Sequence, residues 1–232
     1  MATTEPAVQS DRTFKAAIFD LGGVMTEPLF RNRGDVDPQY FSLIAFFLNE
    51  FRDVYHLPTG AHDLHLLEIG KLSDDEFFDR MCRRYAEAGH EPIDPRVAQR
   101  VVFGRGFVAS TAMIDAVRQV KGAGYRTALL TNVSRDGESL WRGLIPVEDL
   151  FDVVIDSSRV GLRKPDPAIY LLTCERLGVD PSDCLFIDDL ECNVEAARDL
   201  GMQAIQCLEP VDVADDVVRL LVGHGAADEA EA

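Results

Sequence analysis

Residues 16–28 have the sequence AAIFDLGGVMTEP. The stretch opens with an apolar run that ends at Asp20, and Gly22 and Gly23 follow closely. A short apolar run bounded by turn residues is typical of a strand that is buried on both faces, and the paired glycines indicate a tight loop. An aspartate beside glycines is by itself ordinary turn chemistry. The importance of Asp20 therefore depends on the polar residues that end other buried strands.

The composition limits the classes of protein that the chain can belong to. Its 232 residues suit one domain, or one core with a smaller inserted lobe. Its 40 acidic residues outnumber its 23 lysines and arginines, and the formal net charge is -17. Such a surface repels polyanions, so no nucleic-acid partner is expected. No apolar stretch reaches about 18 residues, so no membrane-spanning segment is expected.

The cysteines and the first residues predict a cytoplasmic protein. Five cysteines are scattered along the chain without a Cys-x-x-Cys pair, which suits reduced thiols better than disulfides or a zinc site. Residues 1–11 lack the basic region and apolar core of a signal peptide. Residues 223–232 lack large apolar side chains. We expect 1–11 and 223–232 to be flexible termini.

Apolar runs alternate with helical segments in the second part of the chain. Strands are expected at 126–130, 153–155, 184–187 and 203–207, with a loop at 156–165 and a helix that begins at Pro167. Strands that alternate with helices form parallel sheets with helices on both faces. The sequence therefore predicts an α/β fold with a doubly wound, mostly parallel sheet.

A different pattern fills the segment between the first strand and this second part. Apolar residues recur there at helical spacing, as at Phe41, Ile44 and Leu48. Ser73 and Glu76 form a capping box in front of a further apolar helical run. The segment predicts an inserted bundle of about four short helices.

Three predicted strands end in polar residues. Asp20 follows the first strand, Thr131 ends a second, and Asp188 with Asp189 ends a third. Ligands of such sheets bind beyond the carboxyl ends of the strands, so we expect these residues to gather at one edge. Carboxylates that converge near a backbone carbonyl suit Mg²⁺, which also accepts a substrate phosphate as a ligand.

The same edge carries groups that suit a phosphate ester. The Thr131 hydroxyl, the amide groups around Asn132 and the Lys164 ammonium would bind phosphate oxygens. Asp20 would be the nucleophile, because carboxylates serve as covalent phosphoryl acceptors and divide a slow hydrolysis into two steps.

Four ordered motifs carry a resemblance to a known family. They are DLGGV at 20–24, LTN at 130–132, GLRKPDP at 161–167, and FIDD at 186–189 with Asn193. The set resembles the motifs of the haloacid dehalogenase superfamily. It looks most like the members with a helical cap after the first motif, including the phosphatase domain of soluble epoxide hydrolase.

The resemblance implies roles for individual residues. It implies Asp20 as the nucleophile and Lys164 as the group that neutralises charge. The implied phosphate-binding residues are Thr131, Asn132 and Lys164. The implied ligands of Mg²⁺ are Asp20, the main-chain carbonyl of Gly22, Asp188 and Asp189.

The resemblance also implies how the chain is divided. It implies a core of residues 12–30 and 105–222, in which the first strand is central. Residues 31–104 would form an all-helical cap that covers the site, excludes water and selects the substrate.

Gly22 is a departure from the phosphatases of the family. They usually carry a second Asp at this position, which donates a proton to the leaving group and later activates water. Gly22 keeps the carbonyl for the metal but removes the acid. General acid–base catalysis is typically worth about 100-fold to 10,000-fold. Substrates with good leaving groups, such as acyl and aryl phosphates, need the missing proton least.

Three explanations of the missing acid are open. A cap residue could supply the proton, and His62, Asp63 and His65 are the candidates because histidine titrates near neutral pH. A histidine pair spaced by three on an acidic helix is, however, more often a solvated face. Water could instead do the work in a slow phosphatase, or the protein could have lost catalysis and kept binding.

The sequence thus predicts Mg²⁺-dependent hydrolysis of a phosphate monoester through an aspartyl-phosphate at Asp20. The expected partner is a small-molecule phosphorylated substrate, and the expected state is a monomer or a homodimer. One alternative is a catalytically silent binding or regulatory protein. A 2-haloacid dehalogenase is a weaker alternative, because the Tyr usual in that family is absent at Gly22. A phosphomutase would need the missing acid more than a phosphatase does.

Overall fold

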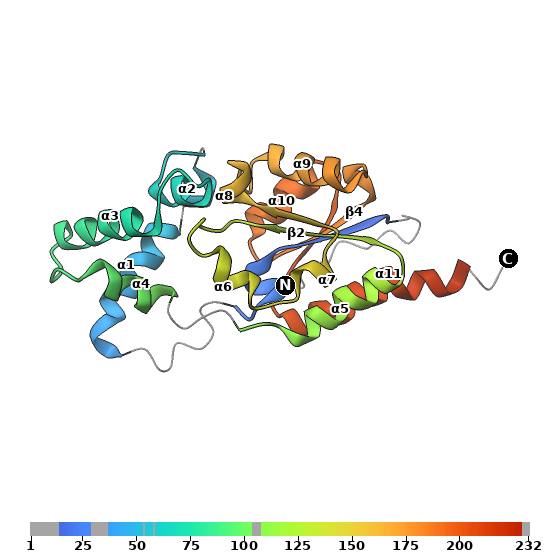
Figure 1. Cartoon of the computed structure of the whole chain (residues 1–232), viewed down its shortest axis with the longest axis horizontal. Helices are drawn as coiled ribbons and strands as arrows, with labels where there is room; N and C mark the ends of the chain where they lie inside the picture. Colours follow the sequence, from blue (N-terminus) through green and yellow to red (C-terminus); the bar gives the residue numbers. More distant parts are fainter. Residues whose placement is uncertain (1–13, 29–36, 53, 58, 104–107, 229–232) are drawn as a thin grey trace, which may run out of the picture.

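The computed structural model describes residues 14–28, 37–52, 54–57, 59–103 and 108–228 (Figure 1). Within these residues one parallel sheet has the strand order β3-β2-β1-β4-β5. The strands are β1 (Ala16–Phe19), β2 (Arg126–Thr131), β3 (Val153–Asp156), β4 (Cys184–Asp188) and β5 (Gln203–Gln206). The predicted parallel sheet is confirmed, and β1 is its central strand.

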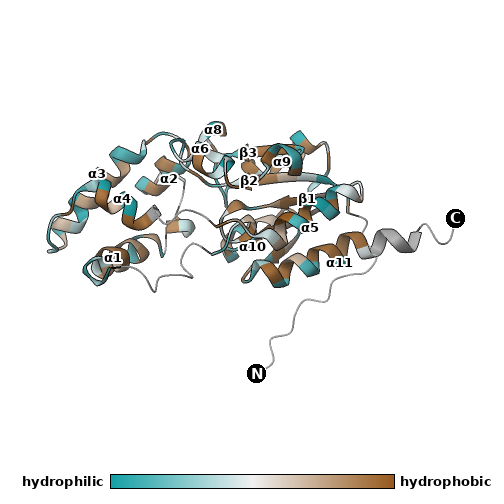
Figure 2. Cartoon of the chain, turned by 60° about the horizontal axis from the view of Figure 1, so that its bottom comes forward, coloured by the Kyte–Doolittle hydropathy of each residue, from teal (hydrophilic) through white to brown (hydrophobic). Residues whose placement is uncertain are grey.

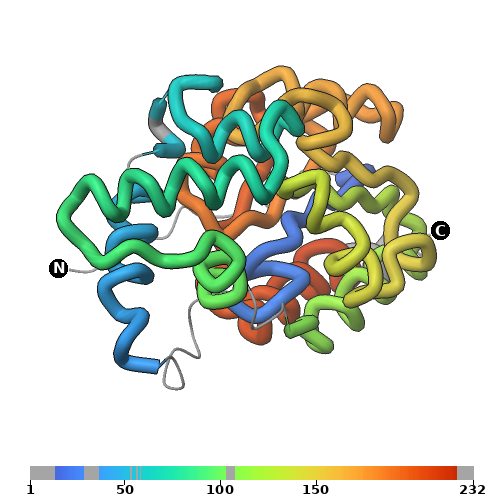
Figure 3. The backbone as a smooth tube through the Cα atoms, turned by 60° about the vertical axis from the view of Figure 1, so that its left-hand side comes forward, coloured from blue at the N-terminus to red at the C-terminus, as the bar shows by residue number. Residues whose placement is uncertain are grey.

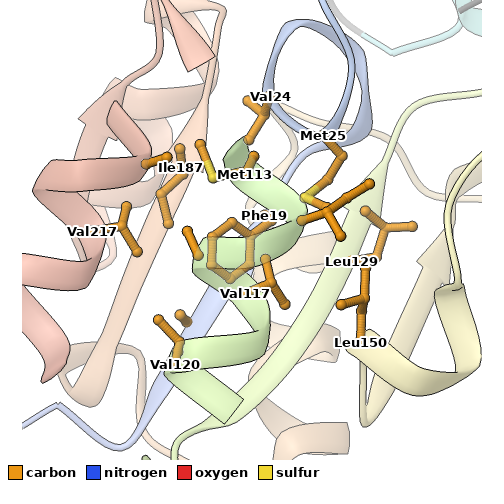
Figure 4. Close-up of a cluster of buried hydrophobic side chains, with 14 of the residues drawn as sticks. Phe19, Val24, Met25, Met113, Val117, Val120, Leu129, Leu150, Ile187 and Val217 are labelled. Atoms are coloured by element: carbon orange, nitrogen blue, oxygen red, sulfur yellow. The ribbon is translucent and has the colours of Figure 1, made fainter. Parts of the chain in front are cut away.

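Helices cover both faces of the sheet. They are α5 (Thr111–Gly122), α6 (Glu138–Arg142), α7 (Val147–Leu150), α8 (Ser157–Val160), α9 (Pro167–Leu177), α10 (Glu191–Asp199) and α11 (Pro210–Asp228). On one face Phe19 packs with residues of α5 and α11, and Figure 4 shows its ring near Val117 and Ile187. On the other face Ile18 packs with residues of α9 and α10. Because both faces are buried, the inner strands contain continuous apolar runs, AAIF in β1, ALL in β2 and CLFI in β4, and the ribbons of β1 and β2 are brown in Figure 2.

A helical lobe lies beside the sheet (Figures 1 and 3). In the sequence it falls between the loop after β1 and helix α5. It contains α1 (Phe41–Phe51), α2 (Asp63–Glu68), α3 (Asp74–Glu87) and α4 (Pro95–Phe103), with 3₁₀ turns at Pro38–Tyr40 and Val54–His56. The lobe has its own hydrophobic cluster, in which Phe47, Phe77 and Met81 are buried. At the start of α3, Ser73 and Glu76 form the predicted capping box. The predicted bundle of short helices is therefore confirmed.

Two expectations differ from the structure. The expected flexible terminus from residue 223 is in part the end of α11, which continues to Asp228. Val213, Val217 and Leu221 recur every four residues and pack into the cluster of α5, so an amphipathic helix forms where the sequence analysis named none. The expected loop at 156–165 contains the short helix α8, which Asp156 caps by accepting from Ser158 N at 2.8 Å.

Several expectations concern residues outside those described. They are the flexible residues 1–11 and 229–232, and the predicted boundaries at 12, 31, and 104 to 105. In the part of the chain that is described, no helix combines the length and the apolar character needed to span a bilayer.

Candidate active site

The register of the sheet brings the predicted site residues to one edge. Phe19 at the end of β1 pairs with Leu129 of β2 on one side and with Ile187 of β4 on the other. Asp20 and Asp188 directly follow Phe19 and Ile187, and Thr131 is the second residue after Leu129. All three therefore lie at the carboxyl edge of three neighbouring strands. The backbone N–H of Asp20 donates to the Ile187 carbonyl at 2.9 Å, which fixes Asp20 against β4.

The loop after Asp20 turns sharply at its two glycines. Gly22 has an ordinary backbone conformation, with φ -71° and ψ 125°. Gly23 has φ 69°, a conformation that side chains disfavour, and a Cβ there would lie 2.7 Å from Oδ2 of Asp189. Gly23 therefore allows the Asp189 carboxylate to pack directly against the loop. Sequence analysis identified the glycine pair as a turn but missed this close approach.

Lys164 joins the carboxylates of two strands. Its side chain is 1 % exposed, and Nζ lies 2.7 Å from Oδ1 of Asp20 and 2.6 Å from Oδ2 of Asp188. Nζ also donates to the Leu130 carbonyl at 3.0 Å. Burial alone would lower the pKa of Lys164, but Asp188 and Asp20 raise it above its usual value, so the side chain stays an ammonium. The predicted charge-neutralising lysine thus contacts the predicted nucleophile.

Asn132 holds the backbone of Lys164. Its side-chain amide donates to the Lys164 carbonyl at 3.0 Å, and its side-chain oxygen accepts from Lys164 N at 2.9 Å. The Asn132 carboxamide, predicted to contact phosphate, is therefore engaged with Lys164. Thr131, the other predicted phosphate binder, is buried at the end of β2 beside β1.

Asp188 is fixed from both sides. Its Oδ1 accepts from Leu190 N and from Nδ2 of Asn193, both at 2.9 Å, while Oδ2 contacts Lys164. Asn193 belongs to the fourth motif, and this contact gives it a structural role. Among the described residues, Asp189 makes no side-chain hydrogen bond to another residue. The Asp189 carboxylate is therefore freer to bind a metal ion than the Asp188 carboxylate.

Three carboxylates converge at this edge. Oxygen atoms of Asp20, Asp188 and Asp189 lie within 4.8 Å of one another. Burial, with Asp188 adding to it against the opposing effect of Lys164, raises the pKa of Asp20 to about 7. Burial, with Asp20 and Asp188 adding to it, raises the pKa of Asp189 to about 8. One ammonium among three carboxylates leaves excess negative charge, and a hard divalent cation fits this donor set.

The three candidate proton donors of the lobe have other partners. His62 accepts from Leu64 N at 3.1 Å and so caps α2. Asp63 forms ion pairs with Arg80 and Arg84. His65 is fully buried, with Nε2 2.7 Å from the Val54 carbonyl, so the solvated-face interpretation is wrong for this residue. These contacts all lie within the lobe.

A buried ion pair between the lobe and the core was missed by sequence analysis. Nε of Arg163 donates to Oε2 of Glu68 at 2.6 Å, across 95 residues of sequence. Arg163 is 0 % exposed, and Glu68 is also buried. The available signal was the position of Arg163 next to Lys164 within the third motif, but nothing in the sequence identified Glu68 as its partner.

Comparisons with known proteins identify the family of the chain. Residues 14–201 match the family of haloacid dehalogenase-like hydrolases. Phosphatase MT3486 of Mycobacterium tuberculosis is 34% identical over 217 residues, which cover 92% of this chain and 96% of that relative. The chain belongs to the haloacid dehalogenase-like hydrolase family. The predicted family resemblance is thus confirmed, and the chain is a hydrolase.

Two further similarities concern this haloacid dehalogenase-like hydrolase. Bifunctional epoxide hydrolase 2 of Sus scrofa is 29% identical over 204 residues, which cover 82% of this chain and 36% of that relative. The chain thus spans about a third of the length of the epoxide hydrolases that it matches. A family enzyme from Bacteroides thetaiotaomicron, solved with magnesium and inorganic phosphate, has a TM-score of 0.57 at 22% identity and covers 83% of this chain and 93% of its own. This last likeness shows the fold.

Proposed function

We propose that this hydrolase is a Mg²⁺-dependent phosphatase that acts on a small phosphate monoester through an aspartyl-phosphate on Asp20. The observation that carries the proposal is the contact of Lys164 with Asp20 and Asp188 at an edge where Asp189 converges. Such a site places a nucleophile, a cation and a metal-binding acid around the position of one phosphoryl group.

The proposed reaction has two steps at Asp20. In the first, a carboxylate oxygen of Asp20 bonds to phosphorus while the bond from phosphorus to the alcohol oxygen breaks, and the alcohol leaves with a proton from solvent. In the second, water hydrolyses the acyl phosphate, which releases inorganic phosphate and restores Asp20. Lys164 stays charged throughout and binds a phosphoryl oxygen, with Thr131 and the main-chain amides near Asn132 beside it.

The residues that would hold Mg²⁺ are Asp20, Asp189, Asp188 and the carbonyl of Gly22. When bound, the cation supplies positive charge that lowers the pKa of these carboxyl groups and reduces the repulsion between Asp20 and a phosphate dianion. Asp188 contributes chiefly by holding Lys164, because both of its oxygens already accept hydrogen bonds.

The proposed substrates are phosphorylated molecules with good leaving groups. Gly22 has no acid to protonate the leaving oxygen, and His62, Asp63 and His65 are engaged within the lobe. The leaving groups of acyl and aryl phosphates are weak bases, so their departure needs no such donor. The printed name of MT3486, a phosphatase, supports the same class of reaction for this chain.

The helical lobe is the proposed cap, and the proposed division is a core of 12–30 and 105–222 with a cap of 31–104. The cap would cover the edge that carries Asp20 and exclude water from the acyl phosphate. The proposal includes a cytoplasmic monomer or homodimer that binds a small phosphorylated molecule. A catalytically silent binding protein with the same site is the alternative that the glycine at position 22 favours.

Turnover of p-nitrophenyl phosphate and acetyl phosphate with Mg²⁺ tests the proposal. We expect hydrolysis by the wild type, loss of activity in EDTA, and loss of essentially all turnover in Asp20→Asn, which keeps the shape of the side chain but removes the nucleophile. Asp183→Asn is the matched control. Asp183 also forms an ion pair with a lysine, Lys15, but it lies just before β4, at the opposite end of that strand from Asp188. A wild type that hydrolyses no member of a broad phosphate panel would favour the silent alternative.

A further inference from the structure

Glu68 is a lobe residue that contacts the core next to the predicted phosphate-binding residues. It is the last residue of α2 and is buried. Its carboxylate accepts from Nε of Arg163 at 2.6 Å. Arg163 directly precedes Lys164, whose ammonium contacts Asp20. The side chain of Glu68 therefore fixes the segment that carries the catalytic lysine.

The main chain of Glu68 reaches a second core segment through Ser157. The Ser157 hydroxyl donates to the Glu68 carbonyl at 2.6 Å, and its oxygen accepts from Val133 N at 3.0 Å. Val133 follows Thr131 and Asn132, the predicted phosphate-binding residues. Ser157 is fully buried, so water does not compete for these contacts.

The two connections close into one ring of contacts. Asn132, next to Val133, bonds both the N–H and the carbonyl of Lys164. One lobe residue is thus tied to two core segments that also bind each other. A shift of Glu68 would move both segments, because protein interiors are close-packed and transmit displacements.

The energetics of the pair favour a positioning role over a stabilising one. Burial raises the pKa of Glu68, and Arg163 offsets only part of that rise. Nη2 of Arg163 is buried and has no hydrogen-bond partner among the described residues, while the ring of Tyr55 lies 5.5 Å from its Cζ. Buried pairs with incomplete hydrogen bonding contribute little net stability, so well-packed apolar side chains would serve stability at least as well.

We propose that Glu68 is a positioning residue, which couples the docking of the helical lobe to the placement of Lys164 and of the 131–133 segment. This inference rests on the proposed phosphatase function for its effect on catalysis. The lobe thereby acts on the phosphate site itself, in addition to covering it. Substrate that draws the lobe onto the core also sets the lysine and the phosphate-binding amides in place.

The test compares Glu68→Gln with Glu50→Gln. Glu50 is a matched control because it is also a lobe glutamate that accepts from an arginine, Nε of Arg84 at 3.1 Å, but both partners lie in the lobe. Hydrogen exchange of peptides that contain Val133 and Lys164 is measured, since both amides donate hydrogen bonds. We expect Glu68→Gln to speed this exchange about tenfold and Glu50→Gln to leave it unchanged.

Catalysis gives the second readout. We expect Glu68→Gln to lower kcat/KM for p-nitrophenyl phosphate, and to raise the inhibition constant of inorganic phosphate, by about 10- to 100-fold. A purely structural role would lower the melting temperature and leave both constants unchanged in the folded protein. Should Glu68→Gln fail to fold, Ser157→Ala tests the main-chain connection through exchange of the Lys164 peptide and the inhibition constant, because this variant removes the acceptor of Val133 N directly.

The outcomes separate the two proposals. Unchanged exchange in both core peptides, or an unchanged inhibition constant in a protein that binds phosphate, overturns the positioning role. Faster exchange in a protein whose wild type hydrolyses no ester supports the positioning of the core segments and overturns the phosphatase function instead.

Discussion

Gly22 and Gly23 are adjacent, but the fold constrains only the second. A Cβ at Gly22 would meet no atom within 4 Å, and the backbone there is ordinary. Gly23 needs its positive φ, and a side chain there would displace the Asp189 carboxylate. The absent acid at position 22 is therefore a chemical difference from the phosphatases of the family and no consequence of limited space.

This difference predicts a gain of activity in Gly22→Asp. The new carboxyl would lie in open space after Asp20, where it could protonate a leaving oxygen. We expect rates for alkyl phosphates to rise by about 100-fold, at the lower end of what general acid catalysis supplies, with little change for acyl phosphates. The measurement is kcat/KM for a matched alkyl and acyl phosphate with Mg²⁺.

Two control variants isolate the acid. Gly22→Asn has nearly the same shape and no acid, so it should gain nothing. Gly23→Asp places the same carboxyl one residue later, where it must displace Asp189, so it should lose activity toward every ester. Unchanged alkyl-phosphate rates in a folded, active Gly22→Asp protein would mean that another residue already donates the proton.

At the scale of elements, the features that could be predicted are those encoded by residues close together in the sequence. Strands β1, β2 and β4 were predictable because each is a short apolar run closed by a polar residue, and α3 because its capping box is local. Their parallel order then places Asp20, Thr131 and Asp188 together. The pairing of Glu68 with Arg163 was not predictable, because it depends on how the lobe docks, and no local pattern encodes that contact. The contact of the Asn132 side chain with Lys164 was missed because it joins two core loops that are 32 residues apart, and no local pattern encodes it.

In the turn after α2 the lobe backbone lies close to the core. Gly70 has φ 69°, and a Cβ there would lie 2.3 Å from the Ser158 carbonyl, which also accepts from Nη2 of Arg135 at 3.0 Å. This carbonyl belongs to α8, next to Ser157. A side chain at position 70 would therefore push the lobe away from α8 and disturb the contacts of Glu68.

Gly70→Ala should consequently lower activity as well as stability. Alanine at a positive φ costs about 1–2 kcal/mol, and the clash adds the displacement of α2. Gly89→Ala is the matched control, because Gly89 also has a positive φ, 91°, but open space around it. We expect both variants to lose a few degrees of melting temperature, and only Gly70→Ala to lose kcat/KM. Equal activities of the two folded variants would show that close docking of the lobe is not needed.

At the scale of the whole molecule, the acidic edge links the stability of the protein to pH. The pKa values of Asp20 and Asp189 are about 7 and about 8 in the folded protein, above their ordinary value of 3.8. Between about pH 4 and pH 8 these groups therefore hold more protons in the folded state than in the unfolded state, and the stability that they contribute falls as the pH rises. The proposed Mg²⁺ would require the deprotonated carboxylates, so the cation and the protons would compete for the same site.

This competition predicts that Mg²⁺ stabilises the protein more at pH 8 than at pH 6. At a hundredfold excess over its Kd a ligand adds about 2.7 kcal/mol to the free energy of unfolding. At pH 6 the stabilisation by Mg²⁺ is smaller, because binding must also release the protons of Asp20 and Asp189. The measurement is the rise in melting temperature on exchanging EDTA for MgCl₂ at each pH, at constant ionic strength. Asp189→Asn should lose most of the rise at both values, while Asp183→Asn should keep it. An equal rise at pH 6 and pH 8 in the wild type would mean that the cation binds elsewhere, because binding to the acidic edge cannot avoid displacing these protons.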